Sequence, residues 1–311
     1  MTAEHSPGAI PWLSVVVAAW GNETLLRQCL THLDAERSRS TASVEVIVAT
    51  SLSLSVADRV AADFSWARVE SVPNATVFTL RARGVALACG ALVAIIEDHV
   101  IVSPGWMSAL QQAHAEGHGI LGGPVDNGSA ETVVGWALYF VEYGMHMPPA
   151  PEGAVTTVSG VNVAYDATLL QNCRDIWQRA FHENEVHDAL AALGHRPWMV
   201  SQAVVSTHLP MSFGGAATHL FTGGRQFASY RAAQTTYGSR AIRVLASPII
   251  PFVLFGRLMQ RIRARRPDRS GWLLRSAGAT LVMLGAWAAG ELTGYAMPQA
   301  RRAAQRGARR A

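Results

Sequence analysis

The sequence predicts an α/β protein with a doubly wound, mostly parallel sheet that has helices on both faces, followed by apolar C-terminal helices at a membrane. Two observations favour this class. Continuous apolar runs alternate with helix-like patterns between residues 13 and 97. The last part of the chain, residues 241–311, is both apolar and strongly basic, although only 15% of all residues are charged.

The first predicted strand is the apolar run Leu13–Trp20, which Gly21 and Asn22 end. Runs of this kind are typical of parallel strands that are buried on both faces. Three further strands are predicted at Val44–Ala49, Ala67–Val72 and Val93–Ile96, of which the last is again a buried apolar run.

Helix-like segments separate these strands. In the first of them the leucines recur at helical spacing from Leu25 to Leu33. The predicted helices are Glu23–Leu33, Val56–Phe64 and the small-residue segment Thr79–Val93. Ligands of such open sheets bind beyond the carboxyl ends of the strands. The turn after Trp20 and the cluster Glu97-Asp98-His99 both lie at such ends.

The rest of the first 240 residues continues the mixed pattern, without an internal repeat. The predicted elements are a helix at Gly105–Glu116, a turn at Gly117–Gly123 before another strand, an aromatic-rich stretch of either type at Thr132–His146, a strand at Thr157–Tyr165, a helix at Val186–Leu193 and a strand at Trp198–Val205 that leads to His208.

Charge divides the chain in two. All 26 basic residues are arginines, and 13 of them lie in residues 241–311, where Asp268 and Glu291 are the only acidic residues. An acidic body with a basic, apolar tail favours an anionic membrane surface as partner. Nucleic acid is disfavoured as a partner, because the arginines flank apolar runs. We therefore predict a catalytic domain at residues 1–240 and a membrane-associated helical tail at residues 241–311.

The tail holds two apolar runs. Val244–Gly256 is shorter than the roughly 20 residues that span a bilayer as a helix, whereas Ser276–Met297 is longer but contains Glu291. Arginines flank the second run on both sides, which favours interfacial helices or a shallow hairpin with both ends cytoplasmic. A hairpin that spans the membrane is the alternative. A transporter is excluded, since the apolar runs are confined to the tail.

The first residues, Met1–Pro11, show no signal-peptide pattern, so we expect the body on the cytoplasmic face of the cell membrane. The three cysteines are odd in number and have no metal-type spacing, which indicates small buried residues in a reducing compartment.

Glu97-Asp98-His99 is the first candidate for chemistry. Two carboxylates and an imidazole after a buried strand are costly unless their charge is balanced, and a divalent cation balances it. The alternative is a solvated loop that caps the next helix.

Arg81 is the second candidate, with Gly84, Ala88 and Gly90 after it. The small residues let a helix approach a sheet or a ligand closely. Arg81 could bind a phosphate in bidentate fashion, or it could be a surface residue.

Two further candidates lie later in the chain. His182, Glu183 and Glu185 stand at the start of a predicted helix, where an ionised carboxylate is favoured and can act as a general base, or simply cap the helix. His208 is either a structural histidine or a metal ligand.

Taken in order, these segments resemble family 2 glycosyltransferases with the GT-A fold, over about residues 13–208. The family's opening strand, aromatic residue and Asn match Ser14–Asn22. Its Arg-Asn-x-Gly-x-x-x-Ala-x-Gly segment matches Arg81–Gly90, and its acidic metal motif matches Glu97-Asp98-His99. Its Gly-x-Asn segment matches Gly160-Val161-Asn162, and its catalytic acidic segment matches residues 182–185.

The resemblance implies an inverting enzyme that moves one sugar from a nucleotide-diphosphate sugar to a lipid-linked or cell-envelope glycan, with Mg²⁺ or Mn²⁺ as cofactor. Trp20 would lie near the nucleotide, or simply pack in the core. The implied site residues are Glu183 as base with Glu185 as the alternative and His182 beside it; Ala18, Trp20, Asn22, Arg81, Glu97 and Asp98 for the donor; Gly160 and Asn162 for the acceptor; and Asp98, His99 and His208 for the metal.

The chain departs from the family pattern in several places. Thr50 and Ser51 replace an Asp pair that contacts the nucleotide base, and Ala82 replaces the Asn after the arginine. These losses favour one alternative function, a catalytically degenerate sugar-binding or scaffold protein at the membrane. A Gln-x-x-Arg-Trp motif is absent from the sequence, which favours transfer of a single sugar. A nucleotidyltransferase is disfavoured, because no glycine-rich basic loop follows the first strand.

Overall fold

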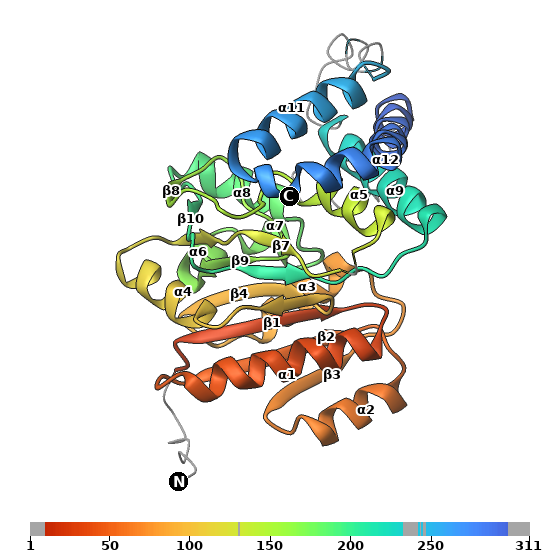
Figure 1. The fold of residues 1–311 in the computed structure, drawn as a ribbon. Coiled ribbons are helices and arrows are strands. Elements are labelled where there is room, and N and C mark those ends of the chain that lie inside the picture. Colours follow the sequence, from red (N-terminus) through yellow and green to blue (C-terminus); the bar gives the residue numbers. More distant parts are fainter. Residues whose placement is uncertain (1–9, 130, 233–241, 243, 245–246, 298–311) are drawn as a thin grey trace, which may run out of the picture. The chain divides into compact units, whose positions relative to one another are not determined.

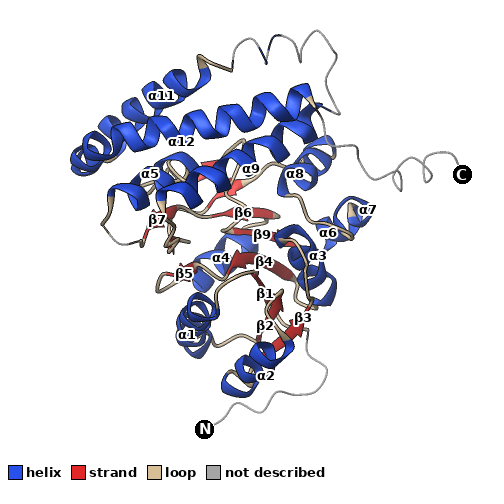
Figure 2. Cartoon of the chain, turned by 90° about the vertical axis from the view of Figure 1, so that its right-hand side faces the viewer, coloured by secondary structure: helices blue, strands red, loops and turns tan. Residues whose placement is uncertain are grey.

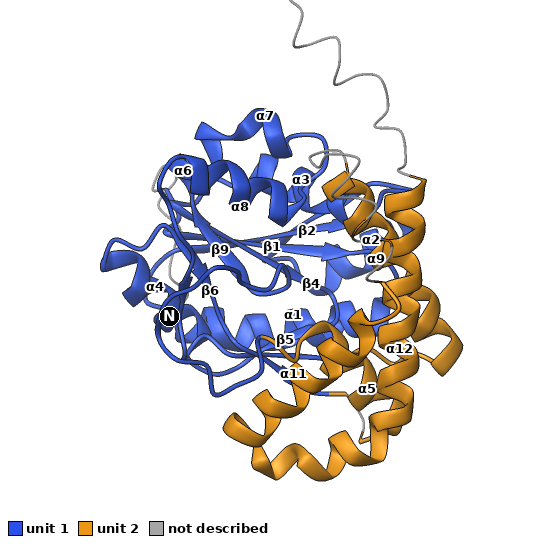
Figure 3. Cartoon of the chain, turned by 90° about the horizontal axis from the view of Figure 1, so that it is seen from above, with its two compact units in different colours: residues 1–128, 146–208 blue, residues 129–145, 209–311 orange. Residues whose placement is uncertain are grey.

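The computed structural model describes residues 10–129, 131–232, 242, 244 and 247–297. The chain forms two compact units, residues 1–128 with 146–208, and residues 129–145 with 209–311 (Figure 3). Residues 240 and 241 lie outside the described ranges, and the functional boundary predicted between them stays a prediction.

The first unit is built around an eight-stranded sheet. Its strands, in spatial order, are β3 (Ala67–Ser71), β2 (Val44–Thr50), β1 (Leu13–Ala19), β4 (Leu92–Glu97), β9 (Val163–Asp166), β6 (Ile120–Gly122), β10 (Trp198–Met199) and β8 (Gly153–Ala154). The pairs β3–β2, β2–β1, β1–β4 and β6–β10 are parallel, whereas β9 is antiparallel to both of its neighbours. All residues of β1 and β4 are buried, as the apolar runs predict.

Helices cover both faces of this sheet, which confirms the predicted class. Figures 2 and 3 show α1 (Glu23–Arg39) and α4 (Trp106–Ala115) on one face, and α3 (Val77–Leu87), α6 (Ala167–Asn172), α7 (Arg174–Trp177) and α8 (Glu183–Ala192) on the other. Helix α2 (Leu54–Asp63) connects β2 with β3 (Figure 1).

Helix α3 is shorter than predicted, because it ends at Leu87 instead of running to Val93. Beyond it, the Gly90 amide donates to the Ser14 hydroxyl, so the chain leaves the helix to begin β4. The small residues have the predicted packing role. A Cβ at Gly84 would lie 2.2 Å from Cγ1 of Val16, so α3 rests directly on β1.

Two predicted strands are shorter or divided. The segment predicted at Thr157–Tyr165 is a strand only from Val163, because a turn closed by the Asn162 amide and the Ser159 carbonyl precedes it. The segment predicted at Trp198–Val205 is split between β10 and β11 (Val205–Thr207). Strand β11 lies in a separate three-stranded sheet, between β5 (Val100–Val102) and β7 (Val125–Asn127).

The described residues of the second unit form helices and loops. The aromatic-rich stretch is helix α5 (Val133–Glu142), which packs with α9 (Phe213–Ala232) and α12 (Ser270–Ala296). Glycines let α9 and α12 approach closely, since a Cβ at Gly290 would lie 2.1 Å from the Phe221 carbonyl oxygen. Helix α11 (Ile250–Arg265) continues from the first apolar run into the arginine cluster, and the short turn η1 (Pro267–Arg269) joins it to α12.

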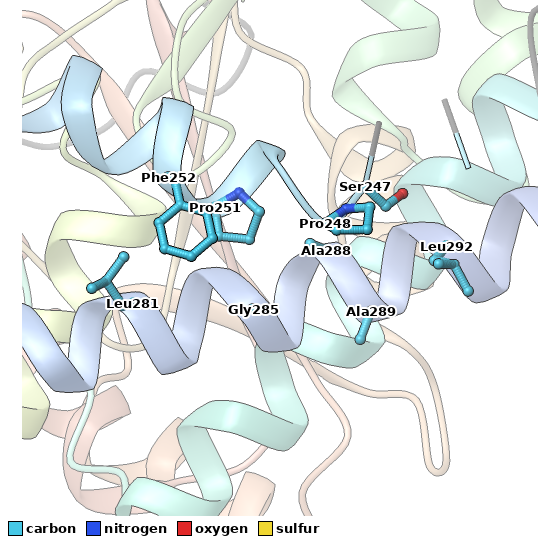
Figure 4. Close-up of a pocket in the computed structure, with 9 residues that line it drawn as sticks. All are labelled: Ser247, Pro248, Pro251, Phe252, Leu281, Gly285, Ala288, Ala289 and Leu292. Carbon is cyan, nitrogen blue, oxygen red and sulfur yellow. The ribbon is translucent and has the colours of Figure 1, made fainter. Parts of the chain in front are cut away.

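Helices α11 and α12 border an apolar groove of about 370 Å³. Figure 4 shows Pro251 and Phe252 of α11 facing Leu281 and Gly285 of α12. Among the described residues, one segment, Pro267–Ala296, is long and apolar enough to cross a membrane. The arginines at 301–310 lie outside the described residues.

Candidate active site

Arg81 lies at the centre of the candidate site, on α3. Its side chain is buried, and its two terminal nitrogens each contact a carboxylate. Nη2 donates to Oε1 of Glu97, at the end of β4, and Nη1 donates to Oε2 of Glu183 at 2.8 Å. One guanidinium therefore joins the acidic cluster after β4 to the first turn of α8. Burial lowers the pKa of Arg81, but the charges of Glu97 and Glu183 outweigh it, so the pKa is raised and the cation persists.

Glu183 is the first residue of α8, after the N-cap His182. Burial raises the pKa of its carboxyl group, but the charge of Arg81, a backbone hydrogen bond and the charges of His187 and His182 more than offset this, so the pKa is below its usual value. A quarter of the side chain remains exposed. Glu183 is therefore an ionised carboxylate that is partly exposed to solvent.

The cluster Glu97-Asp98-His99 is buried, contrary to the solvated-loop alternative: its residues are 7%, 4% and 5% exposed. Nδ1 of His99 lies 3.5 Å from Oε2 of Glu97 and 3.7 Å from Oδ1 of Asp98. The Asp98 amide donates to the carbonyl of Ala18, which places the end of β1 beside the cluster. The structure thus brings together the strand ends at which the sequence predicts a ligand.

Of the three predicted metal ligands, His99 lies beside Asp98, and His208 contacts His99 through the backbone. The His208 amide donates to the His99 carbonyl at 2.8 Å, and Nε2 of His208 lies 3.3 Å from the Ser206 hydroxyl oxygen. Within the described ranges, three or more Asp, Glu, His or Cys side chains do not converge as a metal-binding group. Yet Asp98 is a buried carboxylate that, among the described residues, has no arginine within ion-pair distance. A buried carboxylate beside an imidazole is a pair of groups that suits a divalent cation.

The predicted donor residues after β1 differ in environment. Trp20 is 51% exposed, so its ring is not a core side chain. Asn22 caps α1, because its Oδ1 accepts from the amides of Thr24 and Leu25 at 2.9 and 3.1 Å. Ser51, which replaces an acidic residue of the family pattern, donates to the Trp20 carbonyl. Donor contacts of Trp20 and Asn22 stay predictions.

The two predicted acceptor residues lie in the turn before β9. A Cβ at Gly160 would lie 2.8 Å from Cδ of Glu183 and 3.2 Å from Nη1 of Arg81, so this glycine borders the ion pair. Asn162 is 1% exposed. Its amide donates to the carbonyls of Pro124 and Ala203 and accepts from the indole of Trp106. Its contacts therefore fix the turn, and a role in acceptor binding stays a prediction.

Two histidines near the site were not among the predicted residues. His187 is one turn after Glu183 on α8, and its Nε2 lies 2.9 Å from the buried hydroxyl of Tyr165. Glu183 and His187 are four residues apart, and this spacing could have predicted that they are neighbours, because such residues share a helix face. The second histidine, His32 of α1, acts on His208. Burial has the largest effect in lowering the pKa of His208, and the charges of His32 and His99 lower it further.

Comparison with known proteins decides the family. Residues 11–223 match the model of the glycosyltransferase-like family 2. The chain belongs to glycosyltransferase family 2. This confirms the resemblance predicted from the sequence, and it makes the protein a glycosyltransferase with the GT-A fold.

A solved structure agrees with this fold. The mannosyltransferase PcManGT from Pyrobaculum calidifontis, in complex with GDP-Man and Mn²⁺, is 15% identical to this glycosyltransferase, with 97% of this chain and 80% of that chain covered at a TM-score of 0.50. TarS 1-349 of S. aureus, in complex with UDP-GlcNAc, is 13% identical over 93% of each chain, with a TM-score of 0.49. No curated protein matches the sequence.

Proposed function

We propose that this glycosyltransferase transfers one sugar from a nucleotide-diphosphate sugar to an acceptor hydroxyl, with inversion, and that Glu183 is the general base. The observation that supports this most is the ion pair of Glu183 with Arg81, which keeps the carboxylate ionised beside the acidic cluster after β4. The carboxylate takes the proton of the acceptor hydroxyl while the oxygen attacks the anomeric carbon, and the nucleoside diphosphate leaves.

The donor side of the proposed site lies at the carboxyl ends of β1 and β4. Ala18 and Glu97 pair across these strands, and the exposed ring of Trp20 follows β1. A flat ring at this edge of the sheet suits the nucleotide of the donor. In PcManGT a protein of this fold holds GDP-Man and Mn²⁺.

Asp98, with His99 beside it, would hold a divalent cation, Mg²⁺ or Mn²⁺, and His208 is the third predicted ligand. Asp98 is buried without a described arginine partner, so a cation would balance its charge. When bound, such an ion supplies positive charge that stabilises the departing diphosphate.

The acceptor proposed is a lipid-linked or cell-envelope glycan at the cytoplasmic face of the membrane. Support comes from the second unit alone. Ile249, Phe252 and Val253 of the α11 region are 63%, 67% and 45% exposed, and Phe252 also lines the apolar groove. Exposed apolar side chains beside arginines are typical of segments that lie on an anionic bilayer.

Membrane attachment has its own test. Full-length protein is sedimented with vesicles of anionic and of neutral phospholipid, beside the variants Phe252→Asp and Leu54→Asp. Leu54 is an equally exposed leucine of α2, at 64%. We expect Phe252→Asp to weaken binding and Leu54→Asp to bind like wild type. Equal binding by all three proteins, or no binding to either vesicle, would contradict the membrane proposal.

The catalytic proposal is tested with a panel of UDP-, GDP- and dTDP-sugars, Mn²⁺ or Mg²⁺, and release of nucleoside diphosphate as readout. We expect release from one donor, which a chelator abolishes. Donor binding without release would favour the alternative of a catalytically degenerate sugar-binding protein. That alternative is motivated by Thr50 and Ser51, which stand where the family pattern has an Asp pair. Folded protein that neither binds nor cleaves any donor would contradict the proposal.

A further inference from the structure

Arg81 was a candidate ligand for a donor phosphate, but its contacts suggest a different role. Both terminal nitrogens are engaged with carboxylates, Glu97 on one side and Glu183 on the other. The third nitrogen, Nε, is buried and has no hydrogen-bond partner among the described residues. The side chain is only 6% exposed and already contacts two carboxylates, which disfavours direct binding of a donor phosphate to the guanidinium.

We propose that Arg81 is a positioning residue, which fixes the orientation and the charge of the Glu183 carboxylate. This inference rests on the proposed function of Glu183 as base. It assigns Arg81 to the acceptor side of the reaction, where the proton is removed, instead of to the donor phosphates.

Orientation is fixed from two sides. Arg81 contacts Oε2 of Glu183, and Gly160 lies against the carboxylate from the turn before β9. A Cβ at position 160 would lie 3.0 Å from Oε1 of Glu183 and 2.8 Å from its Cδ, closer than such atoms approach. Any larger residue at 160 would therefore push the carboxylate, the arginine or both out of place.

Charge is fixed by the balance of groups around the carboxylate. Burial alone would raise the pKa of Glu183, and the charge of Arg81 reverses that effect. The other titratable groups that face Glu183 are His182 and His187 of its own helix, which also lower its pKa, and Tyr165 of β9. Burial lowers the pKa of His187. Arg81 is thus the permanent cation among these neighbours.

The arginine also joins the two halves of the proposed reaction. Glu97 belongs to the cluster in which a donor and a cation are expected, and Glu183 to the first turn of α8. Since the same guanidinium contacts both carboxylates, a displacement of one of them shifts the guanidinium and thereby the position of the other. Because the proposed role of Arg81 is to hold the base and not to bind a donor phosphate, we expect a change at Arg81 to lower kcat more than it weakens donor binding.

The test compares Arg81→Met, Arg81→Lys and Gly160→Ala with wild type, with the donor that the panel identifies. Gly278→Ala is the control, because a Cβ at this glycine of α12 meets no atom within 4 Å. The readouts are kcat, the KM for the donor, and the pH at which kcat falls on the acid side; circular dichroism verifies folding.

We expect Arg81→Met to lower kcat by about 10²-fold or more and to move the acid limb upward by about 1–3 pH units, with little change in donor KM. Arg81→Lys keeps the charge, so its acid limb stays near that of wild type while kcat falls. Gly160→Ala moves the carboxylate without removing a charge, so kcat falls and the acid limb stays in place. Gly278→Ala behaves as wild type.

The opposite pattern would overturn the inference: a donor KM raised tenfold or more in Arg81→Met, with kcat and the acid limb unchanged, would make Arg81 a phosphate ligand. If Arg81→Met fails to fold, Arg81→Lys and Gly160→Ala decide, and wild-type kcat in both would overturn the inference. Failure of the proposed function is recognised separately, because Glu183→Gln would then retain full activity.

Discussion

Arg81 and Glu183 are 102 positions apart in the sequence, yet Nη1 of one lies 2.8 Å from Oε2 of the other. One packing contact and one backbone hydrogen bond bring these two residues together. Gly84 lets α3 rest on Val16 of β1, and the Phe181 amide donates to the Phe78 carbonyl, which holds the start of α8 against α3. The candidate base is thus positioned by the fold of the sheet and its helices.

Asn162→Ala tests whether this asparagine serves the fold or the acceptor. Its side chain makes three buried hydrogen bonds, to Trp106, Pro124 and Ala203. Truncation leaves these groups unsatisfied, so we expect a loss of about 2–4 kcal/mol in the free energy of unfolding. Urea denaturation measures it. Unchanged stability with a raised KM for the acceptor would instead favour the acceptor role.

Gly290→Ala tests the close approach of α9 and α12 in the second unit. The added methyl group would lie 2.1 Å from the Phe221 carbonyl oxygen, so the two helices must separate. We expect a lower melting temperature, corresponding to about 1–3 kcal/mol. The matched change on the same helix is Gly278→Ala, which has open space and should be stabilising by about 0.5–1 kcal/mol. Equal effects of the two changes would contradict this packing.

Asp98→Asn tests the proposed cation site. The variant keeps the size of the side chain but removes the charge that a divalent cation would balance. We expect Mn²⁺-dependent binding of the nucleoside diphosphate to weaken at least tenfold in calorimetric titrations, whereas the exposed Asp58→Asn of α2 should bind as wild type does. Unchanged, chelator-insensitive binding in Asp98→Asn would rule out a role of Asp98 in holding a metal.

The pKa of Glu183 predicts how stability depends on pH. Because the folded pKa lies below the usual value, the ionised carboxylate stabilises the folded state at any pH above its unfolded pKa, and this contribution is lost as the pH falls through the folded pKa. Wild type should therefore be more stable than Glu183→Gln at pH 7, and the difference should shrink below pH of about 4. Thermal melts of both proteins at several pH values measure it. A difference that grows on acidification would have the wrong sign.

The local sequence pattern predicted the first half of the sheet well. The runs that contain Leu13–Ala19 and Val44–Thr50 are mostly apolar, as expected of strands that are buried on both faces, and the cluster Glu97-Asp98-His99 lies at the end of such a strand. These features depend on neighbours in sequence, so they can be read from it.

Features that depend on tertiary contacts could not be predicted in the same way. The partners of Arg81 lie 16 and 102 positions away, and no local pattern specifies them. The segment Trp198–Val205 contains residues of two sheets, and its composition does not reveal the division. Asn162 matched the family's acceptor segment, but its three partners come from segments 38 to 56 positions away.

The assignment of Glu183 as the base is tested most directly by measuring sugar transfer by the variants Glu183→Gln and Glu185→Gln, with donor binding measured in both. Both glutamates lie in the first turn of α8, but the ion pair with Arg81 involves Glu183. We predict that Glu183→Gln binds the donor normally and loses about 10²–10⁴-fold in kcat, while Glu185→Gln keeps most of its activity. Full activity of Glu183→Gln, with Glu185→Gln inactive, would contradict the assignment of Glu183 as the base.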